Sequence, residues 1–185
     1  IKKSLFIVDM PKNSYKTSKQ AIKNAKTIIK KTGCDGVKIE NNTVNLNILK
    51  SMCNSKINVM GHIGYTPQFK KKFKVEGKKI SEQLKLLNQA KQIQDAGAFS
   101  IVLECISKDT AKKITKSLKI PTIGIGSSVF CDGQILVTDD IIGLSGFYPK
   151  FVKKYTDVKN LIKKAVKNFS KDVKTKRFPN FKNSF

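Results

Sequence analysis

The sequence predicts an α/β protein whose parallel sheet curls into a barrel. Apolar runs rich in β-branched residues alternate with segments that carry apolar residues at helical spacing, which is typical of parallel strands joined by crossover helices. Polar or glycine residues close these runs, at Asp9, Lys38 and Glu40, His62, Glu104, Gly126, and Asp139 with Asp140. Because the carboxyl ends of parallel strands meet at one end of a barrel, this distribution indicates a functional site there.

Six strands are expected, each a short apolar run, at 4–9, 35–40, 57–62, 99–104, 121–126 and 134–140. Helices are expected at 18–32 with Gly33 as the stop, near 44–54, at 81–96, and at 108–118. In the third of these, Leu84, Leu87, Ala90 and Ile93 are expected to face the core. Residues 69–79 are expected to form a charged loop. A last helix is expected to start at Thr156 or Asp157 and to reach about Lys174.

The composition is that of a globular chain. At 185 residues and 39% hydrophobic content, the chain can bury the core of one domain. No apolar run approaches the roughly 20 residues that a membrane helix needs. The N-terminal apolar run is short and leads directly into Asp9 and Pro11, which does not fit a signal peptide. The cysteines form no CxxC pair, which predicts reduced thiols in a cytoplasmic protein; they are Cys34, Cys53, Cys105 and Cys131.

The net charge of +24 makes a nucleic-acid-binding surface an alternative that must be weighed. Arginine is the residue that such surfaces favour, because its guanidinium group binds phosphates and bases with two parallel hydrogen bonds. Arg177 is the only arginine, and the lysines are spread along the expected helices. The pattern therefore favours a solvated lysine surface over a nucleic-acid site.

Lys38 and Glu40 are two residues apart on one expected strand, so they share a face while Val37 and Ile39 point to the other. In a barrel the apolar face packs against helices, which places Lys38 and Glu40 inside, near the mouth. Spacing alone leaves open an internal ion pair that closes the barrel. Asp9 ends the neighbouring strand and is the expected partner of a buried charge. Asp9 and Glu40 also supply oxygen ligands of the kind that Mg²⁺ prefers.

Glu104 alternates with Ile101, Leu103 and Cys105 and so shares a face with Val102. The charged form of a carboxylate in an apolar strand is disfavoured, which suits a general base. Spacing alone leaves equally open a structural carboxylate neutralised by Lys38. His62, the only histidine, is expected to position substrate or a neighbouring loop as an accessory residue, without a catalytic role. Gly124 and Gly126 are expected either to let a ligand approach the backbone or to serve barrel packing.

Seven motifs occur in an order that resembles one enzyme family: DMPKNSY at 9–15, DGVKIE at 35–40, MGHIGYTPQ at 60–68, IVLECI at 101–106, IPTIGIG at 120–126, CDGQILV at 131–137 and PKFVKKY at 149–155. They resemble ketopantoate hydroxymethyltransferase, also called 3-methyl-2-oxobutanoate hydroxymethyltransferase, an enzyme of pantothenate biosynthesis and hence of the coenzyme A pathway. The similarity spans essentially the whole chain.

The resemblance implies a (β/α)8 TIM barrel that transfers a hydroxymethyl group from 5,10-methylenetetrahydrofolate to 3-methyl-2-oxobutanoate. A Mg²⁺-stabilised enolate is implied as the intermediate, and 2-dehydropantoate (ketopantoate) as the product. By resemblance, Asp9 and Glu40 hold Mg²⁺, Lys38 and Asp9 contact the 2-oxo acid, and Glu104 is the general base. The family also implies a homo-oligomer that works in the cytoplasm, with neither nucleic acid nor membrane as a partner.

About six of the eight strand-helix units of such a barrel are visible. We therefore expect one incomplete barrel domain at 1–185, with a terminal helix at 156–174 and an irregular tail at 177–185. The family's two N-terminal units, with an Asp-Ser pair that adds a metal ligand and a substrate contact, are not seen. A truncated, non-catalytic relic of the enzyme is the first alternative, and a basic nucleic-acid-binding module is the second.

The sequence departs from the family pattern in loops. Asn41-Asn42 stand in place of Gly-Gly, Ser127-Ser128 in place of Ala-Gly, and Asn183 in place of a histidine. The loop after residues 66–68 is also about three residues shorter than in the family. None of these departures changes Asp9, Lys38, Glu40 or Glu104.

Overall fold

The computed structural model describes residues 3–40 and 45–185, which fall into two compact units. The first unit comprises residues 1–135 and the second comprises residues 136–185. The two loop residues Asn41 and Asn42, expected to replace a Gly-Gly turn, lie outside the described residues.

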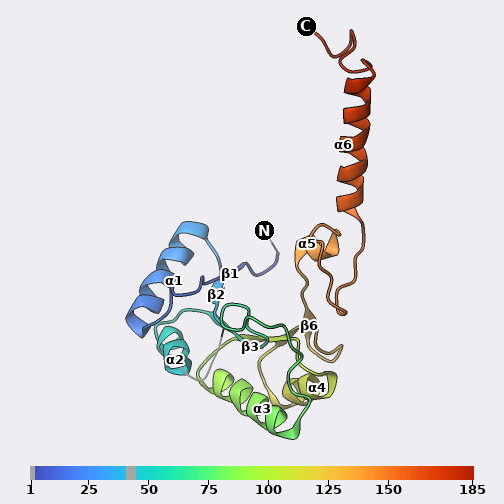
Figure 1. The fold of residues 1–185 in the computed structure, drawn as a ribbon. Helices are drawn as coiled ribbons and strands as arrows, with labels where there is room; N and C mark the ends of the chain where they lie inside the picture. The colour runs from blue at the N-terminus through green and yellow to red at the C-terminus, as the bar shows by residue number, and fades with distance from the viewer. Residues whose placement is uncertain (1–2, 41–44) are drawn as a thin grey trace. The chain divides into compact units, whose positions relative to one another are not determined.

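The first unit contains a six-stranded sheet in which every neighbouring pair is parallel. Its strands, in sheet order, are β1 (Ile7–Asp9), β2 (Gly36–Lys38), β3 (Val59–Gly64), β4 (Ser100–Glu104), β5 (Thr122–Ile125) and β6 (Gly133–Gln134). Spatial order follows chain order, as in a (β/α) barrel. The sheet is a curled part of such a barrel, so the predicted fold class is confirmed (Figure 1).

Four helices connect the strands and pack in succession against one face of the sheet (Figure 1). They are α1 (Ser18–Thr32), α2 (Leu46–Asn54), α3 (Ile80–Asp95) and α4 (Lys108–Ser117). The Thr17 side chain accepts a hydrogen bond from the N–H of Gln20 and so caps the start of α1. Gly33 ends α1 in a left-handed conformation with φ of 68°, as the sequence predicted.

The two faces of the sheet serve different purposes because side chains alternate along each strand. Val37, Val59, Ile101 and Leu103 are fully buried in the core between the sheet and the helices. The opposite face lines a cavity of about 620 Å³. Its strand residues are Ile7, Asp9, Lys38, Met60, Ser100, Val102 and Ile123. Lys38 therefore points into the barrel, while its neighbour Val37 points toward the helices.

Two expectations about local structure were wrong. The sixth strand was expected at 134–140, but only Gly133–Gln134 pairs with β5, and Asp139 and Asp140 lie in the short helix α5 (Thr138–Ile141). Acidic residues in a first turn stabilise a helix start, and here this preference outweighs the apolar run before it. In α3 the buried positions are Leu86, Ala90 and Ile93, whereas Leu84 is 63% exposed. The expectation therefore fails at Leu84 only, since Ala90 and Ile93 are buried as expected and Leu87 packs partly buried against the core.

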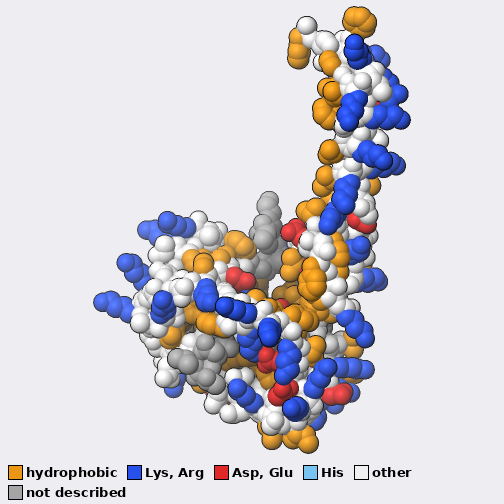
Figure 2. Space-filling model, viewed as in Figure 1, with side chains coloured by type: hydrophobic (Ala, Val, Ile, Leu, Met, Phe, Trp, Pro, Cys, Tyr) orange, Lys and Arg blue, Asp and Glu red, His pale blue; other side chains and the backbone are white. Residues whose placement is uncertain are grey.

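The second unit contains α5 and the long helix α6 (Val158–Lys174). Asp157 caps α6 by accepting a hydrogen bond from the N–H of Asn160. No residue of α6 is buried. Five large apolar residues of α6 are exposed: Leu161, Ile162, Val166, Phe169 and Val173. Figure 2 shows this row in orange beside the blue lysines of the same helix. No helix in the described part of the chain is long and apolar enough to cross a membrane.

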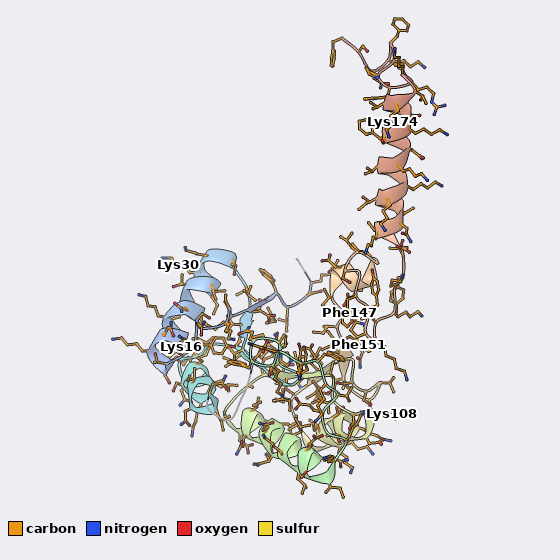
Figure 3. The ribbon with its side chains drawn as sticks, in the orientation of Figure 1. Lys16, Lys30, Lys108, Phe147, Phe151 and Lys174 are labelled. Atoms are coloured by element: carbon orange, nitrogen blue, oxygen red, sulfur yellow. The ribbon has the colours of Figure 1, made fainter. Side chains whose placement is uncertain are left out.

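Most lysines lie on the outer surface of several elements and face the solvent, whereas Lys38 points into the barrel. Lys16 precedes α1, Lys30 lies in the last turn of α1, Lys108 starts α4 and Lys174 ends α6, and all four are exposed (Figure 3). Some lysines pair with carboxylates on the same surface, as Lys91 does with Asp95 at 2.7 Å. Such exposed pairs contribute little to stability. This distribution is that of a solvated surface.

Candidate active site

The ends of β1 and β2 bring Asp9 and Lys38 together. The two residues are paired in the sheet register, so their side chains leave the same face side by side. Nζ of Lys38 lies 3.0 Å from Oδ1 of Asp9. The Lys38 side chain is only 14% exposed, and Asp9 is 62% exposed. The buried ammonium group thus has the carboxylate partner expected from the sequence, while Asp9 retains access to the barrel mouth.

His62 continues this row on β3, and Glu104 continues it on β4. Nδ1 of His62 lies 3.4 Å from Nζ of Lys38, and its Nε2 lies 3.2 Å from Oε2 of Glu104. The ring is 2% exposed, and the Glu104 side chain is 16% exposed. We call these four side chains, Asp9, Lys38, His62 and Glu104, the strand-end row. Since Lys38 pairs with Asp9, the alternative in which Lys38 directly neutralises Glu104 does not describe the contacts in the structure.

Glu40 lies just beyond the end of β2 and is 3% exposed. Its Oε2 accepts a 2.9 Å hydrogen bond from the main-chain N–H of Gln68, and its carbonyl oxygen accepts one of 2.7 Å from the Asn45 amide. Burial raises the pKa of the Glu40 carboxyl, against the opposing effects of the Gln68 N–H and of nearby His62 and Lys38. The site therefore holds a carboxylate whose charge is poorly compensated by protein groups.

Gln68 and Tyr15 hold Glu40 in place, and sequence reasoning assigned neither of them a role. Oε1 of Gln68 accepts a 2.7 Å hydrogen bond from the Tyr15 hydroxyl, and its Nε2 donates one of 3.0 Å to the carbonyl of Met10. Burial raises the pKa of Tyr15 to about 12, and the charges of Glu40 and Asp9 act in the same direction. Tyr15 lies in the motif at 9–15 and Gln68 in the motif at 60–68, and membership of these motifs was the only indication in the sequence that either residue matters.

The backbone at the end of β4 is shaped to present Glu104. Cys105, the next residue, is left-handed with φ of 52°, and its N–H donates a 2.9 Å hydrogen bond to the carbonyl of Ile125. Such a conformation costs a non-glycine residue about 1–2 kcal/mol, so the surrounding structure must impose it. Burial, followed by the charge of Glu104, raises the pKa of the Cys105 thiol to about 12. A buried thiol with a raised pKa is a poor nucleophile.

Gly64 and Ser127 brace the same turn from either side. Gly64 has φ of 93°, and a Cβ there would overlap the carbonyl oxygen of Glu104. The Ser127 hydroxyl donates to the carbonyl of Leu103 at 2.6 Å and accepts from the N–H of Ile106 at 3.1 Å. Ser127 is one of the two serines that replace Ala-Gly, so this departure supplies a bridge across the residues that flank Glu104.

Residues near β5 and β6 make packing contacts and hydrogen bonds that join the two strands. A Cβ on Gly124 would lie 2.8 Å from Oε1 of Gln134 and 3.1 Å from Sγ of Cys131, so the side chains of these two residues pack closely over this glycine. Oδ2 of Asp132 accepts hydrogen bonds from the N–H and the hydroxyl of Thr122, at 2.8 and 2.9 Å. Asp132 thereby fastens the turn before β6 to the start of β5.

The chemistry of a Mg²⁺ site can be tested against the residues present. Within residues 3–40 and 45–185, no group of three or more His, Cys, Asp or Glu is placed to hold a metal ion. Asp9 and Glu40 are nonetheless oxygen donors from adjacent strand ends, and the charge of each acts on Tyr15. Mg²⁺ is often bound by one or two carboxylates, with water or substrate oxygens completing its coordination. Two carboxylates at the barrel mouth fit that donor set.

Comparisons with known proteins point to one family. The family model described as ketopantoate hydroxymethyltransferase matches residues 1–181. The chain is 50% identical over 185 residues to the 3-methyl-2-oxobutanoate hydroxymethyltransferase of Pelagibacter ubique (strain HTCC1062), covering all of this chain and 72% of that protein. It is 45% identical over 189 residues to the protein of that name from Carboxydothermus hydrogenoformans, covering all of this chain and 68% of the relative.

Solved structures support the fold. A crystal structure from Burkholderia cenocepacia J2315, provisionally assigned as a lyase/mutase, aligns with a TM-score of 0.50 and 12% identity. The alignment covers 94% of this chain and 62% of that one. At this identity the likeness concerns the arrangement of strands and helices alone.

Proposed function

Because the chain belongs to the ketopantoate hydroxymethyltransferase family, we propose that it takes part in the following reaction of pantothenate biosynthesis. A hydroxymethyl group passes from 5,10-methylenetetrahydrofolate to 3-methyl-2-oxobutanoate, giving 2-dehydropantoate and tetrahydrofolate. The observation that carries the proposal is the strand-end row, in which a lysine and a carboxylate are linked through one histidine at the mouth of the barrel.

The substrate is proposed to bind in the cavity that Lys38 lines. The Lys38 ammonium is the cation available to the carboxylate of a 2-oxo acid, and Asp9 lies beside it as a further contact. Ile7, Val102 and Ile123 line the cavity and offer an apolar wall to a branched side chain. A small, branched 2-oxo acid therefore matches both the charge and the apolar lining of this space.

Glu104 is proposed to act as the general base. Its carboxylate would take the proton from C3 of the substrate, while the electron pair of that C–H bond moves toward the 2-oxo oxygen and leaves C3 nucleophilic. C3 then forms a bond to the one-carbon unit of the folate, whose bonds to nitrogen break. One water supplies the hydroxyl oxygen and balances the reaction.

Asp9 and Glu40 are proposed to hold Mg²⁺. When bound, the ion polarises the 2-oxo group as a Lewis acid. The poorly compensated charge of Glu40 supports this assignment, because burial destabilises the anion unless a cation is close by. Gln68 and Tyr15 keep the Glu40 carboxylate in place.

The proposal extends to the setting of the enzyme. The four cysteines are free thiols, as is usual for proteins of a reducing compartment, and we propose a cytoplasmic location. We also propose a homo-oligomer, as the resemblance implies. The exposed apolar residues of α6 supply a surface that such an assembly could cover.

Isotope exchange tests the proposed reaction at its first step. The chain is incubated with 3-methyl-2-oxobutanoate and Mg²⁺ in deuterated buffer, and loss of the C3 proton is followed by NMR. Glu104→Gln should abolish the exchange and leave substrate binding nearly intact, whereas Asp95→Asn, which changes an exposed carboxylate at the end of α3, should leave it unchanged. Exchange by Glu104→Gln within about tenfold of the parent, roughly 1.4 kcal/mol of barrier, would remove Glu104 as the base. No exchange by the parent chain would favour a non-catalytic relic.

A further inference from the structure

The contact between Lys38 and His62 determines which ring nitrogen can carry the proton of a neutral imidazole. The Lys38 ammonium has three N–H donors and no acceptor. Nδ1 of His62 lies 3.4 Å from its Nζ and therefore has to present a lone pair. In a neutral imidazole one nitrogen accepts and the other donates. The proton consequently belongs on Nε2.

The nitrogen that carries the proton is the one next to Glu104. Nε2 lies 3.2 Å from Oε2 of that carboxylate, which is an acceptor when ionised. In this structure the contact is close, although its N–H is not aligned as a hydrogen bond to the oxygen. The terminal torsion of a glutamate side chain is broad, so the Glu104 carboxyl can turn to meet that N–H.

We propose that His62 is a positioning residue for the transferase reaction: the Lys38 ammonium fixes it as the Nε2–H tautomer, and it donates that hydrogen to Oε2 of Glu104. One carboxylate oxygen is thereby held, and the other is presented to the substrate. This inference rests on the proposed role of Glu104 as the base. It gives the only histidine of the chain a specific task in which it transfers no proton to the substrate.

The other protonation states of the ring fit the two contacts less well. The Nδ1–H tautomer would set an N–H against the ammonium of Lys38 and a lone pair against the carboxylate of Glu104. Both contacts would then be repulsive. A doubly protonated ring would also direct an N–H at the ammonium. The Nε2–H tautomer is the one state in which both contacts are attractive.

The arrangement links the substrate site to the base through groups on adjacent strands. Asp9 holds Lys38, Lys38 orients the ring of His62, and the ring holds Glu104. Main-chain pairing of β1 to β4 fixes the spacing of all four side chains. The Glu104 side chain is flexible by itself, and its contact with the ring of His62 would fix the orientation of the carboxylate.

The tautomer can be measured directly because the chain has a single histidine. A two-bond ¹H–¹⁵N correlation spectrum of the uniformly labelled chain, without substrate, reports only His62 in its imidazole region. We expect Nδ1 to resonate as an unprotonated nitrogen and Nε2 as a protonated one. In Lys38→Met we expect the preference to weaken and signals of the other tautomer to grow. A parent chain with the proton on Nδ1 would overturn the inference.

Two substitutions then separate positioning from packing. The amide of His62→Gln can place a donor near Nε2, and that of His62→Asn can place polar atoms only near Nδ1. We expect His62→Asn to lower kcat for proton exchange by roughly ten- to a hundredfold with little change in KM, and His62→Gln to recover most of it. Equal losses in both variants would overturn the positioning role.

The two measurements also separate this inference from the proposed reaction. The spectrum needs no substrate, so a parent chain with the Nε2–H tautomer and no exchange activity would count against the reaction and not against the tautomer. If either histidine variant fails to fold, Glu104→Gln provides a second spectrum. Loss of the acceptor carboxylate should shift the Nε2 signal, and an unchanged Nε2 signal would contradict the contact.

Discussion

The main-chain N–H of Gln68 donates a 2.9 Å hydrogen bond to Oε2 of Glu40, so a residue of the loop after β3 fixes the carboxylate that follows β2. The Gln68 side chain bonds to the Met10 carbonyl after β1 and to the hydroxyl of Tyr15. One glutamine therefore fastens the segments that follow three adjacent strands. We call this arrangement the Gln68 latch. Its position next to Glu40 and Asp9 makes it the outer support of the proposed Mg²⁺ site.

Removing the side chain of Gln68 should loosen this support. Gln68→Ala keeps the main-chain bond to Glu40 but loses the bonds to Met10 and Tyr15. We expect Mg²⁺ affinity, measured by calorimetry, to fall by roughly ten- to a hundredfold, the usual cost of losing a residue that orients a metal ligand. Tyr15→Phe removes one of the two bonds and should have a smaller effect. Gln83→Ala, which removes an exposed bond to Lys113, is the control. Unchanged affinity in Gln68→Ala would mean that the latch has no part in metal binding.

Glu40 should lower stability in the absence of metal. Burial raises its folded pKa, so the folded chain binds more protons than the unfolded chain between the two pKa values, and the free energy of unfolding falls as pH rises through that window. With a chelator present at neutral pH, Glu40→Gln should raise the free energy of unfolding by roughly 0.5–2 kcal/mol, as relief of a strained functional site does. The difference from the parent should shrink below the ordinary pKa of 4.5. Urea titrations of the parent and of Glu40→Gln, at neutral pH and below pH 4.5, measure this difference in the free energy of unfolding. A Glu40→Gln variant less stable than the parent at neutral pH would show that Glu40 does not destabilise the metal-free fold.

The strand-end residues could be placed from sequence because the pattern along a strand fixes which way side chains point. Val37 and Leu103 are buried toward the helices, so Lys38 and Glu104 had to face the interior. The expected strand at 134–140 failed because Ile135, Leu136 and Val137 carry strand-forming character into a helix start at Thr138. Asp139 and Asp140 favour a helix start, but the apolar run before them obscured that preference in the sequence.

The supports of the site could not be predicted in the same way. The bond from Tyr15 to Gln68 joins residues 53 positions apart, and that from Ser127 to Leu103 joins residues 24 apart. Their partners depend on how loops lie over the barrel mouth, and no periodic pattern in the sequence encodes that. His62 was recognised as a strand-end residue, but its two contacts come from β2 and β4 and emerge only once the strands are paired.

Metal and substrate should bind together if they share the ion. Asp9→Asn retains the size of the side chain but removes the charge that pairs with Lys38. We expect it to weaken Mg²⁺ and 3-methyl-2-oxobutanoate binding in parallel, each by roughly tenfold or more. Addition of EDTA to the parent chain should weaken 2-oxo acid binding in the same way. Asp95→Asn, which removes an exposed partner of Lys91, should change neither. Unaltered 2-oxo acid affinity in Asp9→Asn and in EDTA would sink the shared-ion model.

Gly64 should be essential for presenting Glu104, and Gly33 provides a matched control. Both have positive φ, 93° and 68° respectively, so alanine is strained at either position. At Gly33 a Cβ would meet nothing within 4 Å, and Gly33→Ala should cost only about 1 kcal/mol. At Gly64 the Cβ would overlap the Glu104 carbonyl, forcing the ends of β3 and β4 apart.

We therefore expect Gly64→Ala to lower the unfolding midpoint more than Gly33→Ala and to abolish C3 proton exchange, while Gly33→Ala keeps it. Displacement of a catalytic group by about 1 Å can cost roughly a hundredfold in rate. The loss should therefore exceed what partial unfolding explains, and this can be checked by scaling the rate to the folded fraction from urea titration. Exchange in Gly64→Ala equal to that in Gly33→Ala, at the same folded fraction, would show that the close approach of β3 to Glu104 does not set the position of the base.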